Sequence, residues 1–164
     1  ASMLLAFSYP FMKRITYWPQ LFLGLTFNWG IVMAWAAMHN SISIEVIILY
    51  IAAIFWTLGY DTIYGVQDIV DDEIIGIKST SIKFKKNIKL FVGVCYLLSS
   101  FLIITLFYNE IGLNNFTLLV VIFISSLMYQ IFKFKKNNSK KCLEIFRLNN
   151  LSGFLLFFGI LLIN

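Results

Sequence analysis

Long apolar runs separated by short polar connections dominate the pattern of this chain. A helix that crosses the roughly 30 Å hydrocarbon core of a bilayer needs about 20 mostly apolar residues. Four runs meet that length fully or nearly, at residues 20–38, 44–60, 90–108 and 113–132. A fifth run at 148–163 is shorter, so its helix would need to start within the polar residues before it. Residues 3–12 form an apolar stretch too short to span. We expect about five spanning helices, preceded by the tail of a helix whose beginning is missing.

The basic residues support this layout because they occupy alternate connections. Lys13 and Arg14 precede the first run, five lysines lie between residues 67 and 89, and the other six basic residues lie within 133–147. The connections near residues 39–43 and 109–112 contain neither Lys nor Arg. By the positive-inside rule, the basic connections face the cytoplasm. The C-terminus is then predicted to lie on the outer side.

Composition agrees with a lipid environment. Hydrophobic residues make up 60% of the chain and charged residues only 13%, too few for the surface of a soluble domain. The net charge of +5 does not indicate nucleic acid, because the basic residues lie between spans, where they meet anionic lipid headgroups. Cys95 and Cys142 are isolated and form neither a disulfide framework nor a zinc pattern. We therefore predict an all-α membrane protein, with residues 1–164 forming one transmembrane domain.

Acidic residues are concentrated directly after the second run. Asp61 is followed within twelve positions by four more, which are Asp68, Asp71, Asp72 and Glu73. If the helix continues to Asp72, then Asp61, Tyr64, Asp68 and Asp72 share one face. Carboxylates one turn apart repel each other unless a cation compensates them. Mg²⁺ favours one or two carboxylates together with substrate phosphate oxygens. The spacing therefore predicts Asp68 and Asp72 as metal ligands.

The other charged residues of this segment allow more than one interpretation. Lys78 can meet a phosphate as a point charge. Asp61 lies at the edge of an apolar crossing, where a carboxylate is costly and usually functional, although it can also mark the helix end. For Glu73 we favour a solvated loop residue without a function, and Asp71 stays open between the two.

Polar residues elsewhere are less specific. Lys13 and Arg14 can neutralise a diphosphate, but taken alone they are better explained as an anchor at the membrane interface. Asn149 precedes the fifth run and can cap its helix or contact a ligand, and capping is favoured on local grounds. Asn28, within the first run, must face protein or water, because an unpaired amide is costly in hydrocarbon.

Three segments of the chain resemble signatures of the UbiA prenyltransferases, in the family's order and spacing. They are YPFMKRITYWPQLFLGLTFNWG, YDTIYGVQDIVDDEIIGIKST and FRLNN. The likeness is strongest to the 4-hydroxybenzoate polyprenyltransferases of ubiquinone biosynthesis. It implies a nine-helix bundle whose central cavity opens toward the cytoplasm. Two aspartate-rich motifs would hold Mg²⁺ there against the diphosphate of a polyprenyl donor.

The resemblance also implies roles for particular residues. The second aspartate-rich motif, of the form DxxxD, matches Asp68 and Asp72 as metal ligands. The implied catalytic residues are Asp61 and Tyr64, in a YDxxY pattern, and Lys78, in a GxKS tail. Implied substrate-binding residues are Lys13, Arg14, Lys78 and Asn149. The implied reaction ionises an allylic diphosphate, and the ring carbon ortho to the phenol of 4-hydroxybenzoate attacks the resulting carbocation.

The chain departs from the family at the first aspartate-rich motif, since no Asp occurs before Asp61. We therefore expect the C-terminal part of such an enzyme, whose N-terminal half is missing, in a bacterial or mitochondrial inner membrane. Two other classes stay open, a non-catalytic remnant and a fragment of a transporter or channel. A CDP-alcohol phosphotransferase is disfavoured, because its DGxxAR signature is not present.

Overall fold

The computed structural model describes residues 2–136 and 138–163, and within them the fold is entirely helical, without strands. The predicted class, an all-α membrane bundle, is confirmed. In this described part, five helical stretches are long and apolar enough to cross a membrane, as predicted. They are Pro19–His39, Ile44–Tyr64, Ile88–Leu106, Asn115–Lys133 and Ser139–Leu161.

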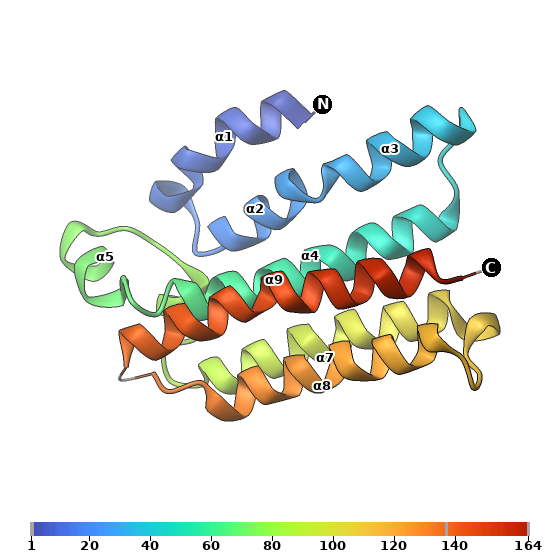
Figure 1. The fold of residues 1–164 in the computed structure, drawn as a ribbon. Coiled ribbons are helices and arrows are strands. Elements are labelled where there is room, and N and C mark those ends of the chain that lie inside the picture. Colours follow the sequence, from blue (N-terminus) through green and yellow to red (C-terminus); the bar gives the residue numbers. More distant parts are fainter. Residues whose placement is uncertain (1, 137, 164) are drawn as a thin grey trace.

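The first crossing is divided into two helices. After α1 (Ser2–Ile15), the chain turns into α2 (Pro19–Phe27) and α3 (Trp29–His39), which lie nearly end to end (Figure 1). The predicted span at residues 20–38 is confirmed, and the structure shows an interruption within it. The interruption lies at Asn28, whose amide Nδ2 donates to the Gly24 carbonyl at 2.8 Å and to Thr57 Oγ1 at 2.8 Å. The predicted need of this amide for a polar partner is thus met by α4.

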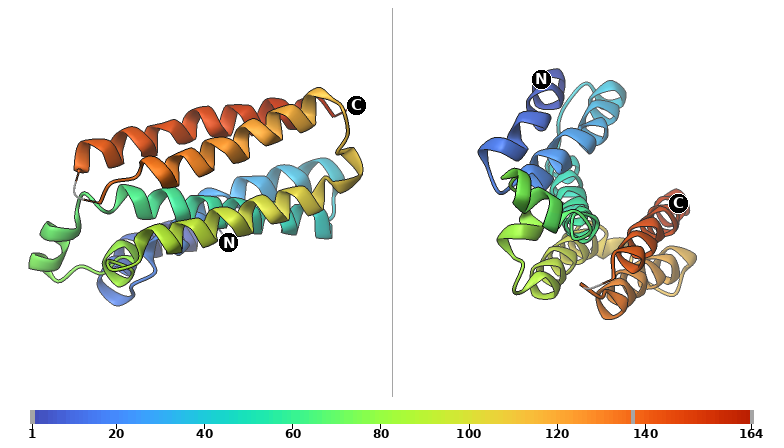
Figure 2. Two further views of the ribbon diagram at one scale, coloured as in Figure 1. Left: turned by 90° about the horizontal axis from the view of Figure 1, so that it is seen from below. Right: turned by 90° about the vertical axis from the view of Figure 1, so that its left-hand side faces the viewer.

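The helix α4 (Ile44–Tyr64) is the centre of the bundle. It packs against α2, α3, α9 (Ser139–Leu161) and, most extensively, α7 (Ile88–Leu106). The close approach to α7 requires glycine, because a Cβ at Gly59 would lie 2.5 Å from Cε1 of Tyr96. The helix α8 (Asn115–Lys133) follows a short 3₁₀ turn, η1 (Tyr108–Glu110), and packs mainly on α9. Viewed along the bundle, α4 lies between the α2–α3 layer and the α7–α9 helices (Figure 2).

The last crossing begins within the polar residues that precede its apolar run, as the shortness of that run required. Asn138 caps α9, its Oδ1 accepting from the Lys141 amide at 3.0 Å, so the helix starts nine residues before the apolar run at Leu148. Asn149 therefore lies inside α9, and the prediction that it caps this helix is wrong. The helix thus extends beyond the apolar part of its sequence, into the polar residues before Leu148.

The acidic segment is also less regular than predicted. The helix does not continue to Asp72, because α4 ends at Tyr64 and residues 65–68 form a turn stabilised by i→i−3 backbone hydrogen bonds. Gly65 begins the turn at a crowded point, where a Cβ would lie 2.6 Å from Ser81 Oγ. Two short helices follow, α5 (Ile69–Ile75) and α6 (Thr80–Lys83).

Candidate functional site

Three predicted aspartates come together although the helix between them is broken. Asp61 lies in the last turn of α4, Asp68 is the N-cap residue of α5, and Asp72 lies in the first turn of α5. The Asp72 amide donates to the Asp68 carbonyl at 2.8 Å, which places the two residues one helical turn apart. The Asp68 carboxylate is a charged neighbour of both Asp61 and Asp72. The turn thus preserves the cluster that a continuous helix was expected to form.

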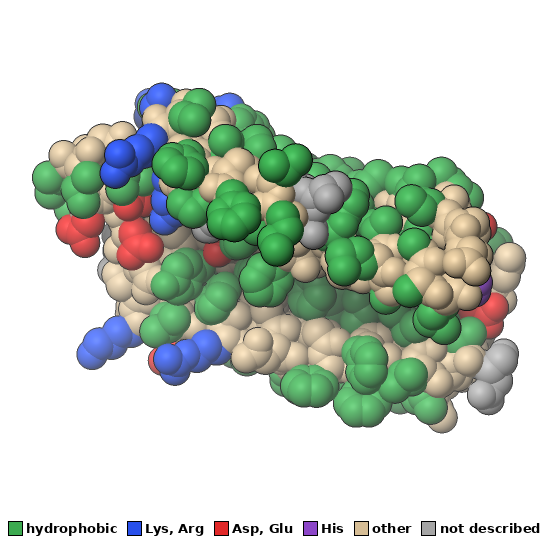
Figure 3. All heavy atoms as spheres, turned by 90° about the horizontal axis from the view of Figure 1, so that it is seen from above, with side chains coloured by type: hydrophobic (Ala, Val, Ile, Leu, Met, Phe, Trp, Pro, Cys, Tyr) green, Lys and Arg blue, Asp and Glu red, His purple; other side chains and the backbone are tan. Residues whose placement is uncertain are grey.

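Lys13 supplies the nearby positive charge. This lysine, in the last turn of α1, is a charged neighbour of Asp61 and of Asp72. Burial raises the pKa of the Asp72 carboxyl; Lys13 opposes this shift, whereas Asp68 and Asp71 reinforce it. Figure 3 shows acidic and basic side chains gathered at the end of the molecule where α5 lies.

The three carboxylates have unmet bonding capacity. Within residues 2–136 and 138–163, none of Asp61, Asp68 and Asp72 accepts a side-chain hydrogen bond or has a cation within ion-pair distance. Asp72 is only 9% exposed, so water cannot fully compensate its charge. The cluster is therefore short of positive charge.

These residues fit Mg²⁺ as part of a site. Carboxylate oxygens are hard ligands, and one or two of them usually hold Mg²⁺ together with substrate phosphates. In the described part of the chain, no group of three Asp, Glu, His or Cys residues is arranged to hold a metal by itself. Asp68 and Asp72 can therefore hold the ion only when further ligands, such as phosphate oxygens, complete its coordination.

The loop after α5 is fastened to α1 and α2. Gly76 ends α5 with a φ of 77°, a conformation that favours glycine. The Lys78 amide donates to the Lys13 carbonyl at 2.8 Å, and Lys78 Nζ donates to the Ile15 carbonyl at 3.1 Å. Lys78 thus lies at the end of α1, where it holds Lys13 in place through the backbone. Arg14, its predicted companion, has an exposed side chain.

Sequence reasoning missed the polar residues whose hydrogen bonds also hold the loop after α5 in place. Gln20 Oε1 accepts from the Thr80 amide at 3.0 Å, and the hydroxyls of Thr62 and Thr80 lie 2.7 Å apart. All three side chains are buried. The available signal was an amide side chain, Gln20, at the very start of an apolar run, since polar groups in such positions need partners.

A cavity of about 390 Å³ begins beside Asp61. Asp61 lies in its wall, between α2, α4 and α9. The remaining lining residues are Leu23, Phe27, Asn28, Trp56, Thr57, Tyr60, Phe146, Asn149 and Asn150. A cavity with several aromatic walls and a few polar groups, next to a carboxylate cluster, can accept a molecule with a hydrocarbon or aromatic body and an anionic end that binds through a cation.

A buried hydrogen-bond network supports the wall of this cavity. Trp56 Nε1 donates to Asn149 Oδ1 at 2.9 Å, and Asn149 exchanges longer hydrogen bonds of 3.2 and 3.3 Å with the Gln130 amide. Gln130 Oε1 also accepts from the Tyr96 hydroxyl at 2.7 Å. Asn149, predicted to bind substrate, thus lies at the cavity with its amide already bonded to protein. Tyr64, predicted to be catalytic, packs its ring against that of Phe146, with the two ring centroids 4.8 Å apart.

Comparison with known proteins places this geometry in a family. The profile of the UbiA prenyltransferase family matches residues 1–159. The mitochondrial 4-hydroxybenzoate polyprenyltransferase of Bos taurus is 42% identical over 100% of this chain and 44% of its own length. The 4-hydroxybenzoate octaprenyltransferase of Psychromonas ingrahamii is 40% identical over 99% of this chain and 56% of its own length. That of Vibrio parahaemolyticus is 40% identical over 98% of this chain and 57% of its own length.

The chain spans about half the length of the curated relatives it matches. No solved structure matches it. The family match covers nearly all of the chain, including both the carboxylate cluster and the aromatic cavity. The chain belongs to the UbiA prenyltransferase family.

Proposed function

We propose that this chain forms part of the active site of an enzyme that transfers a polyprenyl group from a polyprenyl diphosphate to an aromatic acceptor of the 4-hydroxybenzoate type. The observation that carries the proposal is the cluster of three unpaired aspartates beside an aromatic cavity. The names of the relatives, 4-hydroxybenzoate polyprenyltransferases and octaprenyltransferases, support both substrates. The predicted place is the inner membrane, with the site on the cytoplasmic or matrix side.

The donor is bound at the carboxylate cluster. Asp68 and Asp72 would hold Mg²⁺, which supplies positive charge to the diphosphate as it departs. Lys13 is close enough to Asp61 and Asp72 to meet the same phosphates as a second cation. The loop that carries Lys78 keeps Lys13 in this position, because its backbone amide holds the Lys13 carbonyl.

The cavity provides the place where the new bond forms. The donor loses its diphosphate and becomes an allylic cation, which aromatic ring faces such as those of Trp56, Tyr60 and Phe146 can stabilise while they exclude water. A ring carbon of the acceptor then donates an electron pair to that cation, and the same carbon loses its proton. Asp61, in the cavity wall, can accept this proton.

The test is transfer of labelled polyprenyl diphosphate to 4-hydroxybenzoate in membranes. The chain is expressed with and without the part of the Psychromonas protein that it does not match. We expect Mg²⁺-dependent product when both are present. Asp68→Asn and Asp72→Asn should each lower product formation by about 100-fold or more, the usual effect of removing a charge-stabilising group at a reacting centre.

Asp71→Asn is the matched control, because Asp71 lies on the same short helix with an exposed side chain. This variant should retain activity within a few-fold of the unaltered chain. Full activity of Asp68→Asn and Asp72→Asn would refute the metal assignment. No transfer by any combination, with both segments shown to be inserted, would favour a non-catalytic remnant or a transporter fragment.

A further inference from the structure

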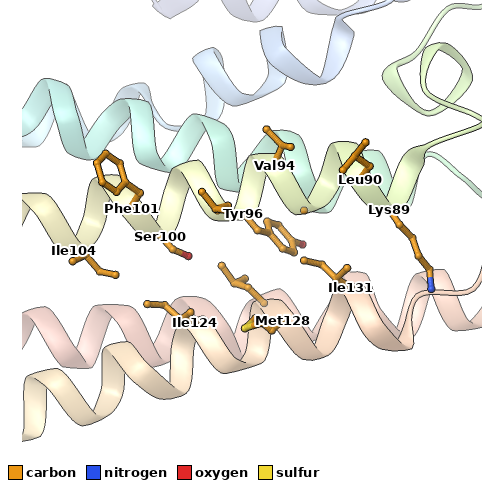
Figure 4. A pocket seen from close by; sticks show the side chains of 13 residues that line it. Lys89, Leu90, Val94, Tyr96, Ser100, Phe101, Ile104, Ile124, Met128 and Ile131 are labelled. Carbon is orange, nitrogen blue, oxygen red and sulfur yellow. The ribbon is translucent and has the colours of Figure 1, made fainter.

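An apolar groove runs along the outer side of the bundle between α7 and α8, away from the carboxylate cluster. Its volume is about 550 Å³, and its lining is almost wholly apolar. On α7 the lining positions recur every three or four residues from Lys89 to Ile104, and on α8 they recur in the same way from Ile124 to Ile131. Figure 4 shows Ile124, Met128 and Ile131 among the side chains that line the space between the two helices.

One end of this groove is cationic. A second hollow of about 370 Å³ shares Lys89 and Leu90 with the groove and is also lined by Lys85, Lys86 and Lys136. Neither hollow contains an acidic residue among its lining residues. In Figure 4 the side chain of Lys89 extends from α7 toward the end of α8.

Two of these lysines are available to a ligand. Lys85 is paired with Glu73 at 2.7 Å, and Lys136 Nζ donates to the Lys85 carbonyl at 2.7 Å. Among residues 2–136 and 138–163, by contrast, Lys86 and Lys89 have neither an ion pair nor a side-chain hydrogen bond. Two uncompensated cations thus lie where an apolar groove reaches the polar end of the bundle.

We propose that this groove binds one anionic glycerophospholipid, with an acyl chain between α7 and α8 and its phosphate against Lys86 and Lys89. The length fits: from Lys89 to Ile104 the groove extends about 22 Å at about 1.5 Å per residue. One leaflet of a bilayer with a core of roughly 30 Å is about 15 Å deep, so the groove can hold a whole acyl chain. The two unpaired cations select an anionic headgroup over a zwitterionic one.

This lipid site is separate from the proposed prenyl-transfer site, so the two can be tested independently. The chain is reconstituted in vesicles of equal parts phosphatidylglycerol and phosphatidylethanolamine and extracted in mild detergent. Mass spectrometry then measures how much of each lipid remains bound per chain. We expect phosphatidylglycerol to be enriched over phosphatidylethanolamine on the unaltered chain.

Two kinds of variant test the two parts of the site. Replacing Lys86 and Lys89 together by Gln should lower retained phosphatidylglycerol by at least about fivefold, the effect of one lysine near an anionic surface. Gly93→Leu should block the groove and lower the retained phosphatidylglycerol by a similar factor. A Cβ at Gly93 has as its nearest neighbour only Ile131 Cδ1, at 3.9 Å, so the larger side chain can enter the groove.

Each variant has a matched control. Replacing Lys133 and Lys140 by Gln removes the same charge at the same end of the bundle without touching the groove. Gly30→Leu adds the same side chain within a span, where a Cβ at Gly30 has no neighbour within 4 Å. The proposal is supported if both controls retain as much phosphatidylglycerol as the unaltered chain while the two test variants retain less. Equal retention in the Lys86 and Lys89 variant, or no lipid enrichment at all, overturns it. The proposal is also overturned if Gly93→Leu leaves the retained phosphatidylglycerol unchanged, the result expected if another helix or a second copy of the chain fills the groove.

Discussion

Asn149 connects three helices through its side chain. Its replacement should therefore destabilise the bundle more than replacement of a neighbouring residue. It is 8% exposed and bonds to Trp56 of α4 and Gln130 of α8. Asn149→Leu keeps the side-chain volume roughly constant while it removes every one of these hydrogen bonds. In the described part of the chain, Trp56 Nε1 has no other acceptor.

The magnitude follows from what each partner loses. A buried donor left without an acceptor costs about 1–3 kcal/mol. Hydrogen bonds between membrane helices average only about 0.6 kcal/mol, with a maximum near about 1.7 kcal/mol. Gln130 keeps its bond to Tyr96 at 2.7 Å, so its loss is small. We expect Asn149→Leu to lower the free energy of unfolding by about 2 kcal/mol, close to a 30-fold change in the unfolding equilibrium.

The assay is reversible unfolding of the purified chain in detergent micelles by titration with sodium dodecyl sulfate, followed by circular dichroism. Asn150→Leu is the matched control, because Asn150 is the next residue of the same helix and is exposed. It should change the free energy of unfolding by less than about 0.5 kcal/mol. Our reasoning would be wrong if both variants lost the same stability or if Asn149→Leu were as stable as the unaltered chain.

Two further outcomes are expected. Gly59→Val should destabilise the bundle by about 1–3 kcal/mol in the same unfolding assay, because even a Cβ would lie 2.5 Å from the Tyr96 ring. Gly30→Val should cost far less, because a Cβ at Gly30 has open space around it. Equal losses of stability in the two variants would contradict the close packing of α4 on α7. The predicted orientation in the membrane can be tested by thiol labelling, since the exposed residues Lys86 and Asn109 flank opposite ends of α7. Lys86→Cys should react with a membrane-impermeant thiol reagent only from the cytoplasmic side, and Asn109→Cys only from the outer side. The reverse pattern would refute the predicted orientation.

Local sequence determined the helical spans and the chemistry of the site. Apolar length is a property of consecutive residues, so the spans around Ile44–Tyr64 and Asn115–Lys133 were predicted to within a few residues. The spacing of Asp68 and Asp72 is equally local, because one helical turn brings any two such residues together. The resemblance to the UbiA prenyltransferases also depended on short segments and was confirmed by the family match.

Only the tertiary structure decided which distant groups meet. Trp56 and Asn149 are 93 residues apart in the sequence, and their hydrogen bond depends on how α4 packs against α9. The same holds for Lys13, which is a charged neighbour of Asp61 and Asp72 although it lies on α1, whose end is hydrogen-bonded to Lys78. The aromatic cavity and the groove between α7 and α8 likewise arise from spaces left between packed helices. Apolar length specifies that a spanning helix forms. Such spaces depend instead on how several helices cross and how far apart they lie, which side-chain contacts between remote segments determine.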